Sequence, residues 1–295
     1  MKTKFALNKK DNQQLSAMMF LLPALILFVL FKYYPIIQGF FISFFEIDIV
    51  NLPGKFVGFA NYSRAFSDKY FYSSLWNSVQ FWLVGLVMTF WPPIVLALLI
   101  NEVRKYRTFM RLVYFIPAIA PPIASLVLWK YIWQPDYGFA NYLLSLFNIP
   151  PQLWLNDVNL VYWVMAFPGL IIAGGMNMLI YLASLQSIPN DLYESAVIDG
   201  AGFFKRIRYI TLPMIMPMIK TLFILDFIGR FNEVTTPMIM TGGGPAGATE
   251  TMILYAYKSA MNNLDYSYAI TLANVVFIIV FAITALQMGM EKKQT

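Results

Sequence analysis

The sequence predicts an all-α, polytopic membrane protein with six transmembrane helices. Two observations predict this fold class. The first is composition: the 295 residues are 59% hydrophobic and 12% charged, with a mean hydropathy of +0.61, whereas a typical soluble domain has about 45–50% apolar and about 25% charged residues. The second is the presence of six long apolar stretches, since a helix needs about 20 mostly apolar residues to cross a bilayer.

The six predicted spans follow one another along the chain. They cover approximately residues 16–44, 75–100, 109–133, 159–184, 213–237 and 267–289. The first is longer than a span requires and contains Lys32 and Pro35, so its membrane-crossing part should end near Tyr34. We expect a retained helix rather than a cleaved signal peptide, because the apolar run is long and no small-residue cleavage site follows it.

These spans divide the chain into three parts. Residues 1–15 are predicted to form an N-terminal tail, residues 16–290 a single six-helix transmembrane domain, and residues 291–295 a C-terminal tail. Within the domain, a polar loop of about residues 186–212 separates the fourth span from the fifth. The loops at the opposite end are of moderate length and leave no room for a large extra domain.

The distribution of lysine and arginine predicts the orientation. About thirteen of these residues lie in the two tails, in the loops after the second and fourth spans and at the start of the third span (Arg111), against roughly four in the loops at the other end. Because positively charged loops stay in the cytoplasm, both termini and the 186–212 loop are predicted to be cytoplasmic. The net charge of +6 is divided among short loops, which favours the lipid bilayer, and not nucleic acid, as its partner.

The sequence contains no cysteine and no histidine. This removes disulfides, thiol nucleophiles, imidazole bases and metal sites of the cysteine or histidine type. Carboxylates are few and scattered, so we expect no catalytic residue, no metal site and no bound cofactor, and we predict that the chain is not an enzyme. A phosphate-binding loop is not expected either, because Gly-Lys-Ser/Thr does not occur in the sequence.

The 186–212 loop has a defined local pattern. Asp191 and Glu194 have the spacing of a capping box, which predicts a short helix from about Leu192 to Asp199. Gly200 follows it and can adopt the left-handed conformation that ends many helices.

A second short helix is predicted from Phe203 to Ile210. Leu212-Pro213 should then start the fifth span, since proline is tolerated in the first turn of a helix. An ordinary polar loop with good helix caps would explain each of these features alone. It does not explain the specific order in which the residues occur.

That order resembles the cytoplasmic loop of permease subunits in bacterial binding-protein-dependent ABC importers. In that family Glu-Ala-Ala is followed three residues later by glycine and, about ten residues after that, by Ile-x-Leu-Pro. This sequence matches at Glu194, Ala196, Asp199, Gly200, Ala201, Ile210, Leu212 and Pro213, and it departs at Ser195, where alanine is usual. Residues 56–62, 185–189, 243–245 and 249–260 are similar to the carbohydrate branch, above all to its maltose- and glycerol-3-phosphate-type first permease subunit.

The resemblance implies the type I ABC importer permease fold and a function. The implied function is a permease subunit that translocates an oligosaccharide or glycoside across the bacterial cytoplasmic membrane. The implied partners are a second homologous permease subunit, two cytoplasmic ATPase subunits that bind the ATP, and an extracytoplasmic sugar-binding protein. The residues implied to couple to the ATPase are Glu194, Ser195, Ala196, Asp199, Gly200, Ala201, Leu212 and Pro213.

The fifth span carries ionisable residues, which are costly inside a bilayer and indicate function. Asp226, Arg230 and Glu233 are spaced to share one face of the helix, with Gly229 and Asn232 beside them. The alternative is that Asp226 and Arg230 pair with each other, which does not exclude a place in a cavity wall.

Resemblance to the maltose-type permease implies which residues line the substrate pathway. It points to Asn232 and Glu233, and to the Gly174-Gly175-Met176-Asn177 stretch of the fourth span as the opposing wall, although the two glycines are explained equally well by close helix packing. The residues predicted for this pathway are Asn177, Asp226, Gly229, Arg230, Asn232 and Glu233.

Two other functions remain as alternatives. An ion-coupled secondary transporter could use Asp226 and Glu233, but it should show inverted repeats or paired broken helices, and neither is visible in the sequence. A membrane-embedded enzyme would need a clustered acid, base or metal set, and the sequence offers none.

Overall fold

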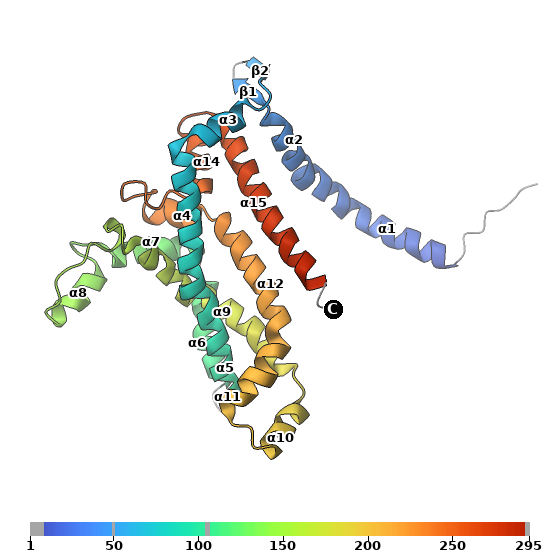
Figure 1. Ribbon diagram of the computed structural model, residues 1–295, viewed down its shortest axis with the longest axis vertical. Helices are drawn as coiled ribbons and strands as arrows, with labels where there is room; N and C mark the ends of the chain where they lie inside the picture. Colours follow the sequence, from blue (N-terminus) through green and yellow to red (C-terminus); the bar gives the residue numbers. More distant parts are fainter. Residues whose placement is uncertain (1–8, 49–50, 104–106, 293–295) are drawn as a thin grey trace, which may run out of the picture.

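Helices make up most of the structure (Figure 1). The computed structural model describes residues 9–48, 51–103 and 107–292, so residues 1–8 and 293–295 of the two predicted tails lie outside the described part. The sheet in the described part has two antiparallel strands. The numbered elements are α1 (Lys9–Phe28), α2 (Tyr34–Ile42), β1 (Phe45–Asp48), β2 (Asn51–Phe56), α3 (Ala60–Ser67), α4 (Lys69–Gly85), α5 (Trp91–Glu102), α6 (Arg107–Ile119), α7 (Pro122–Ile132), α8 (Phe139–Leu146), α9 (Val161–Gln186), α10 (Asn190–Ile198), α11 (Phe203–Arg206), α12 (Leu212–Phe231), α13 (Thr235–Met240), α14 (Met252–Met261) and α15 (Tyr266–Lys292).

Four helical runs in the described part are long and apolar enough to cross a membrane. They are Ala17–Ile42 (α1 to α2), Lys69–Glu102 (α4 to α5), Phe203–Phe231 (α11 to α12) and Tyr266–Met290 in α15. Two bent pairs, α6 with α7 and the two parts of α9, bring the number to six if each pair is one span. The predicted all-α class is therefore confirmed, and these six segments overlap the six predicted spans.

The third predicted span, residues 109–133, is wrong as a single straight helix. The chain turns by 92° between Thr108–Ile119 and Pro122–Ile132. The cause is the Pro121-Pro122 pair, because proline has no N–H group and disfavours helical geometry in the residue before it. Pro121 accordingly leaves the helical region, with ψ of 124°, and becomes the N-cap of α7.

Helix α9 lies at the centre of the bundle (Figure 1). It bends by 54° between Val161–Ile171 and Gly174–Gln186, and Pro168 inside the helix accounts for a kink in this region. Its second part packs with α5 and α12 around a buried apolar cluster. The buried members of this cluster are Phe90, Ile94, Ala97, Ile100, Met178, Tyr181, Leu182, Leu185, Ile188, Ile215, Ile219 and Leu222. This core fixes the end of the bundle from which the 186–212 loop emerges.

The first span stands apart from the bundle (Figure 1). No residue in its most apolar 18-residue window is buried. Its α2 end contacts α15, where Gly39 lies against Ile270 and the ring of Phe40 meets that of Phe277 edge-on, with centroids 5.4 Å apart. An apolar helix of this length without a protein cover needs lipid or another chain along its surface.

Helices α3, α4, α14 and α15 meet at the end of the bundle opposite α10 (Figure 1), and charged side chains lie there. Arg64 pairs with Asp265 at 2.6 Å, and Asp68 accepts hydrogen bonds from the hydroxyls of Tyr255 and Tyr268. Burial raises the pKa of the Asp68 carboxyl, but these hydrogen bonds, one from the Tyr70 backbone N–H and the nearby Arg64 charge together lower it by more, so that its pKa lies below its ordinary value. This end of the molecule therefore presents ionised groups, as an aqueous surface does.

Candidate functional site

Helix α10 forms the tip of the 186–212 loop (Figure 1). The predicted helix over Leu192–Asp199 exists, but it begins two residues earlier, at Asn190. The predicted capping box is wrong, because Pro189 is the N-cap residue and no side chain caps the helix. Asp191 lies instead within the first turn, where its carboxylate is favoured by the positive end of the helix dipole.

Gly200 ends α10 as predicted. Its φ of +72° is left-handed, its N–H donates to the Val197 carbonyl at 3.0 Å, and the Ala201 N–H donates to the Ala196 carbonyl at 2.8 Å. These two hydrogen bonds are the Schellman arrangement, which satisfies the last carbonyl groups of a helix. A Cβ atom on Gly200 would meet nothing within 4 Å, so the need for glycine comes from the backbone conformation and not from lack of space.

The second short helix predicted over Phe203–Ile210 is wrong as a separate element. Helix α11, a π-helical segment (Ile207–Thr211) and α12 form one continuous helix, Phe203–Phe231. At the end of the π-helical segment the Leu212 N–H donates to the Ile207 carbonyl, five residues earlier, and the helix continues past Pro213 despite its missing N–H. The loop is therefore joined to the fifth span by a single helical rod.

The surface around α10 carries most of the residues implied to contact an ATPase. Glu194, Ser195, Asp199, Gly200 and Pro213 are exposed, and Ala196, Ala201 and Leu212 are half-buried. Three exposed apolar residues on the same surface were not predicted: Val197, Ile198 and Phe204, the last two 87% and 83% exposed. The available signal was their position inside an otherwise polar loop, where large apolar side chains have no reason to occur unless a partner covers them.

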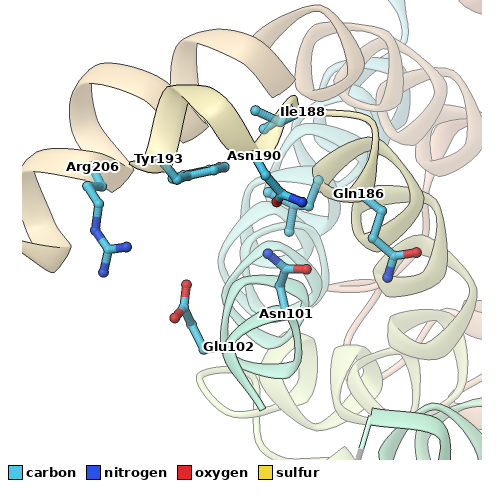
Figure 2. Close-up of a pocket in the computed structure, with 8 residues that line it drawn as sticks. Asn101, Glu102, Gln186, Ile188, Asn190, Tyr193 and Arg206 are labelled. Atoms are coloured by element: carbon cyan, nitrogen blue, oxygen red, sulfur yellow. The ribbon is translucent and has the colours of Figure 1, made fainter. Parts of the chain in front are cut away.

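A polar pocket of about 600 Å³ lies behind α10 (Figure 2). It is lined by Asn101, Glu102, Leu185, Gln186, Ile188, Asn190, Tyr193 and Arg206. Figure 2 shows Glu102, at the end of α5, and Arg206, on α11, facing each other across the pocket. The Tyr193 hydroxyl lies 3.0 Å from Thr211 Oγ1 and links α10 to the rod. Two residues therefore hold α10 to the bundle: Ile188, which lies just before the helix in the buried apolar cluster, and Tyr193 within it. The pocket is the open space between them.

A second cavity, of about 370 Å³, lies further along the rod. It is lined by Phe81, Pro122, Leu126, Met165, Ala166, Pro168, Gly169, Asp226, Gly229, Arg230, Glu233, Thr235 and Thr236. Four of the predicted pathway residues are therefore brought together there: Asp226, Gly229, Arg230 and Glu233. Asn232 is exposed, and its side-chain amide donates to the Ile228 carbonyl at the end of α12. Asn177 lies half-buried elsewhere on α9.

Asp226 and Arg230 form the ion pair that their spacing predicts. Arg230 Nε lies 3.2 Å from Asp226 Oδ1, and both side chains are mostly buried. The guanidinium also donates to Thr89 Oγ1 and lies 5.7 Å from the centroid of the Phe81 ring. Asp226 Oδ2 is buried and has no hydrogen-bond partner among the described residues. Pairing and a place in the cavity wall therefore occur together.

Glu233 lies at the turn from α12 to α13. Its Oε1 accepts the Thr236 backbone N–H at 2.7 Å and so orders the start of α13. The lining as a whole has two carboxylates and one guanidinium, with donors and acceptors on one wall and apolar side chains such as Leu126 and Met165 on the other. Such a cavity suits a hydroxylated ligand, whose O–H groups need both donors and acceptors and whose C–H faces need apolar contacts.

Gly85 contributes to this site and was not predicted. A Cβ atom on Gly85 would lie 2.3 Å from Arg230 Nε and 2.4 Å from Arg230 Cζ. Thr89 follows one turn later, inside a π-helical segment (Leu86–Phe90). Gly85 and Thr89 thus form a notch that receives the guanidinium. Thr89 and Arg230 are 141 positions apart in the sequence, and no local pattern indicates such a contact.

The Gly174-Gly175 pair is better explained by helix packing than by the cavity. A Cβ atom on Gly175 would lie 2.1 Å from the backbone carbonyl oxygen of Tyr114, so α6 and α9 approach closely there. Neither glycine is part of the cavity lining.

Comparison with known proteins identifies a family. The family described as "Binding-protein-dependent transport system inner membrane component" matches residues 93–294. The probable ABC transporter permease protein YurN of Bacillus subtilis (strain 168) is 33% identical over 278 residues, which cover 93% of this chain and 95% of YurN. The trehalose/maltose transport system permease protein MalF of Thermococcus litoralis is 33% identical over 272 residues, covering 91% and 92%. The sulfoquinovosyl glycerol transport system permease protein SmoG of Agrobacterium fabrum is 32% identical over 275 residues, covering 93% and 89%.

A solved structure shows the same fold. A chain of a bacterial ABC transporter involved in the import of the acidic polysaccharide alginate aligns with a TM-score of 0.86 and 24% sequence identity, covering 97% of this chain and 98% of that chain. The predicted importer permease fold is therefore confirmed. With a family match over more than half of its length and relatives above 30% identity, this multi-pass membrane chain belongs to the family of inner membrane components of binding-protein-dependent transport systems.

Proposed function

We propose that this chain is a permease subunit of an ABC importer that moves a sugar, either an oligosaccharide or a glycoside, across the bacterial cytoplasmic membrane. Its relatives include permeases named for trehalose/maltose and sulfoquinovosyl glycerol transport. The observation that carries the proposal is the continuous helix Phe203–Phe231, which begins in the α10 loop and ends beside the cavity at Arg230. A displacement applied to the loop would reach the cavity through this helix.

The coupling site in this proposal is the exposed surface of α10. Glu194, Ser195, Ala196, Asp199, Gly200 and Ala201 would contact an ATPase subunit, and Leu212 and Pro213 would pass the displacement on within the rod. Coupling requires contacts that differ between two states of the transporter. A helix closed by a Schellman arrangement keeps its shape between such states, and a helical rod of 29 residues extends about 43 Å from the loop.

The proposal includes three kinds of partner. A pair of cytoplasmic ATPase subunits would bind and hydrolyse the ATP, so that this chain is a non-catalytic subunit without a cofactor of its own. A second permease chain would cover the first span, which has no buried residue in its apolar window, and would complete the cavity. An extracytoplasmic sugar-binding protein would deliver the sugar at the charged end formed by α3, α4, α14 and α15.

The proposed orientation places α10 and both termini in the cytoplasm. Lys205, Arg206 and Arg208 adjoin α10, and the other basic clusters of the sequence lie on the same side of the predicted spans.

Copurification tests the proposal. The chain, expressed with its neighbouring genes and extracted in mild detergent, should elute with an ATPase subunit. Glu194→Lys should lower the recovered ATPase several-fold, because it reverses an exposed charge on the docking surface. Asp136→Lys reverses an exposed charge outside that surface and should leave recovery unchanged. A chain that elutes alone and moves solute in ATP-free vesicles would instead support the ion-coupled alternative.

Replacing Gly85 by alanine should slow uptake by roughly tenfold. The added methyl group displaces the Arg230 guanidinium from its notch and breaks hydrogen bonds that are each worth about 1.5–3 kcal/mol. Arginine is long and flexible, so we expect the helices to remain packed. Initial uptake rates in right-side-out vesicles measure the effect.

The matched tests use Arg230 and a second glycine. In an Arg230→Ala background, Gly85→Ala should reduce any residual uptake no further, because alanine leaves no atom at the Cδ, Nε and Cζ positions that the added methyl group meets. Gly229→Ala adds a methyl group with nothing within 4 Å and should preserve most of the uptake. An equal effect of Gly85→Ala with and without Arg230 would contradict the role assigned to the notch.

A further inference from the structure

The segment between α7 and α9, residues 134–156, projects sideways from the bundle and contains α8 (Figure 1). Four apolar residues of α8 recur with the spacing of one helix face, and Phe147 follows them at the C-cap. These residues are Phe139, Tyr142, Leu143, Leu146 and Phe147, and all of them are exposed, Phe147 to 75%. An exposed apolar surface of this kind on a folded element indicates a partner.

Hydrogen bonds of a buried asparagine fix the shape of the hairpin formed by residues 134–156. Asn141 is buried, and its side-chain amide donates to the carbonyls of Pro135 at 2.8 Å and Gln152 at 2.9 Å. Its carbonyl oxygen accepts the Gln152 N–H at 3.0 Å and the Trp154 indole N–H at 2.7 Å. The amide group thus uses both donors and both acceptor positions. The apolar face of α8 is therefore held outward by the fold.

After Asp136 near its start, the hairpin carries no ionised side chain. No aspartate, glutamate, lysine or arginine occurs between Asp136 and Asp157. The end formed by α3, α4, α14 and α15 differs, since Arg64 and Asp265 form an ion pair there and Lys258 pairs with Glu250. A charged side chain is costly in the hydrocarbon core of a bilayer. An uncharged apolar face therefore matches lipid, whereas the charged end matches an aqueous partner.

The position of the hairpin also favours lipid. Helix α6 has 13 residues and rises about 20 Å, which is less than the roughly 30 Å hydrocarbon thickness of a bilayer. With α6 rising from the cytoplasmic side, as the basic residues at its start predict, the chain turns by 92° into α7 before it has crossed the bilayer. This favours a start of the hairpin within the depth of the bilayer. Trp133 lies at the base of the hairpin, and the centroid of its indole ring is 5.7 Å from that of Trp129 and 4.9 Å from that of Trp154. Tryptophan rings are common at membrane interfaces.

We propose that the hairpin is a lipid-embedded wedge: α8 lies in the leaflet away from α10 and presents its Phe139–Leu146 face and Phe147 to acyl chains. The wedge would do more than anchor the chain. Pro122 and Leu126 of α7 line the cavity of about 370 Å³, and α7 leads directly into the hairpin. The bilayer would therefore hold one wall of the cavity in place from outside the bundle.

A single introduced cysteine tests this proposal, because the chain has no cysteine of its own. Phe147→Cys is labelled with an environment-sensitive nitrobenzoxadiazole probe in the complete transporter, reconstituted in nanodiscs of phosphatidylcholine. Doxyl-labelled phosphatidylcholine, with the nitroxide on the acyl chain, should quench this probe at least threefold more than the same probe at Tyr70→Cys, an exposed site at the charged end. Aqueous iodide should quench the two probes in the opposite order. Leu146→Cys serves as the second variant if Phe147→Cys fails to assemble.

Two results would overturn the proposal. Strong iodide quenching at Phe147→Cys without lipid quenching would place α8 in water. Lipid quenching in the isolated chain that disappears in the complete transporter would show that a second permease chain or a binding protein covers α8. Neither result depends on the identity of the sugar or on ATP hydrolysis, so a failure of the wedge is distinct from a failure of the proposed transport function.

Discussion

Replacing Gly200 by valine should lower ATP-coupled uptake by about tenfold or more while leaving the chain in the membrane. Gly200 has φ of +72°, a conformation that costs an L-residue roughly 1–2 kcal/mol and a β-branched residue more. Valine would therefore open the Schellman closure of α10 and move Ala201 and the start of the rod. Since 1.4 kcal/mol corresponds to a factor of ten, misplacement of the loop is sufficient for this loss. Uptake and membrane content of the variant are measured together.

Gly202 supplies the matched control. It lies two residues further on with φ of −68°, and a Cβ atom there would also meet nothing within 4 Å. Gly202→Val should therefore leave uptake close to that of the native chain. Gly200→Asn should lose less than Gly200→Val, because asparagine tolerates the left-handed region better than other L-residues. Equal losses in Gly200→Val and Gly202→Val would show that bulk at the docking surface, and not the helix closure, determines coupling.

Replacing Arg230 by glutamine should destabilise the chain by about 3–5 kcal/mol, the cost of leaving one partner of a buried ion pair uncompensated. Asp226 already has one buried carboxylate oxygen without a hydrogen-bond partner among the described residues, and it would lose its contact with Arg230 Nε as well. Thermal unfolding of the detergent-solubilised complex, followed by the loss of monodisperse protein, measures the change.

The double variant Asp226→Asn/Arg230→Gln separates stability from transport. It removes both charges at once, so thermal stability should return to near that of the native complex. Uptake should stay low, because Arg230 also lines the cavity and supplies hydrogen-bond donors to it. Full recovery of uptake in the double variant would mean that the pair is structural only, and the cavity would then lose its assigned place in the pathway.

The fold could be predicted from the sequence to the extent that it depends on local composition. Six apolar stretches indicated six spans, and the left-handed Gly200 followed from its place after a short helix. The break at Pro121-Pro122 was available in the sequence, but hydropathy alone joined 109–133 into one span. The continuous Phe203–Phe231 helix could not be predicted, because a π-helical segment that carries a helix past Pro213 has no signal in the spacing of residues.

The cavity was predictable only along one helix. Asp226, Arg230 and Glu233 share a face of α12, so their spacing placed them together. Gly85 could not be predicted as part of the same site, because it belongs to a different span and its role depends on the distance between two helices. Asn177 was assigned by resemblance, and in this structure it lies outside the cavity lining.

ATP-driven sugar uptake by the reconstituted transporter tests the central claim most directly. Proteoliposomes contain this chain with its partner permease and ATPase subunits, and a panel of radiolabelled oligosaccharides is added with the binding protein. The account predicts uptake of at least one sugar that requires ATP on the α10 side and is lost in Gly200→Val but kept in Gly202→Val. Uptake that proceeds without ATP, or that is unchanged in Gly200→Val, would contradict the claim that the α10 loop and its rod couple ATP hydrolysis to transport.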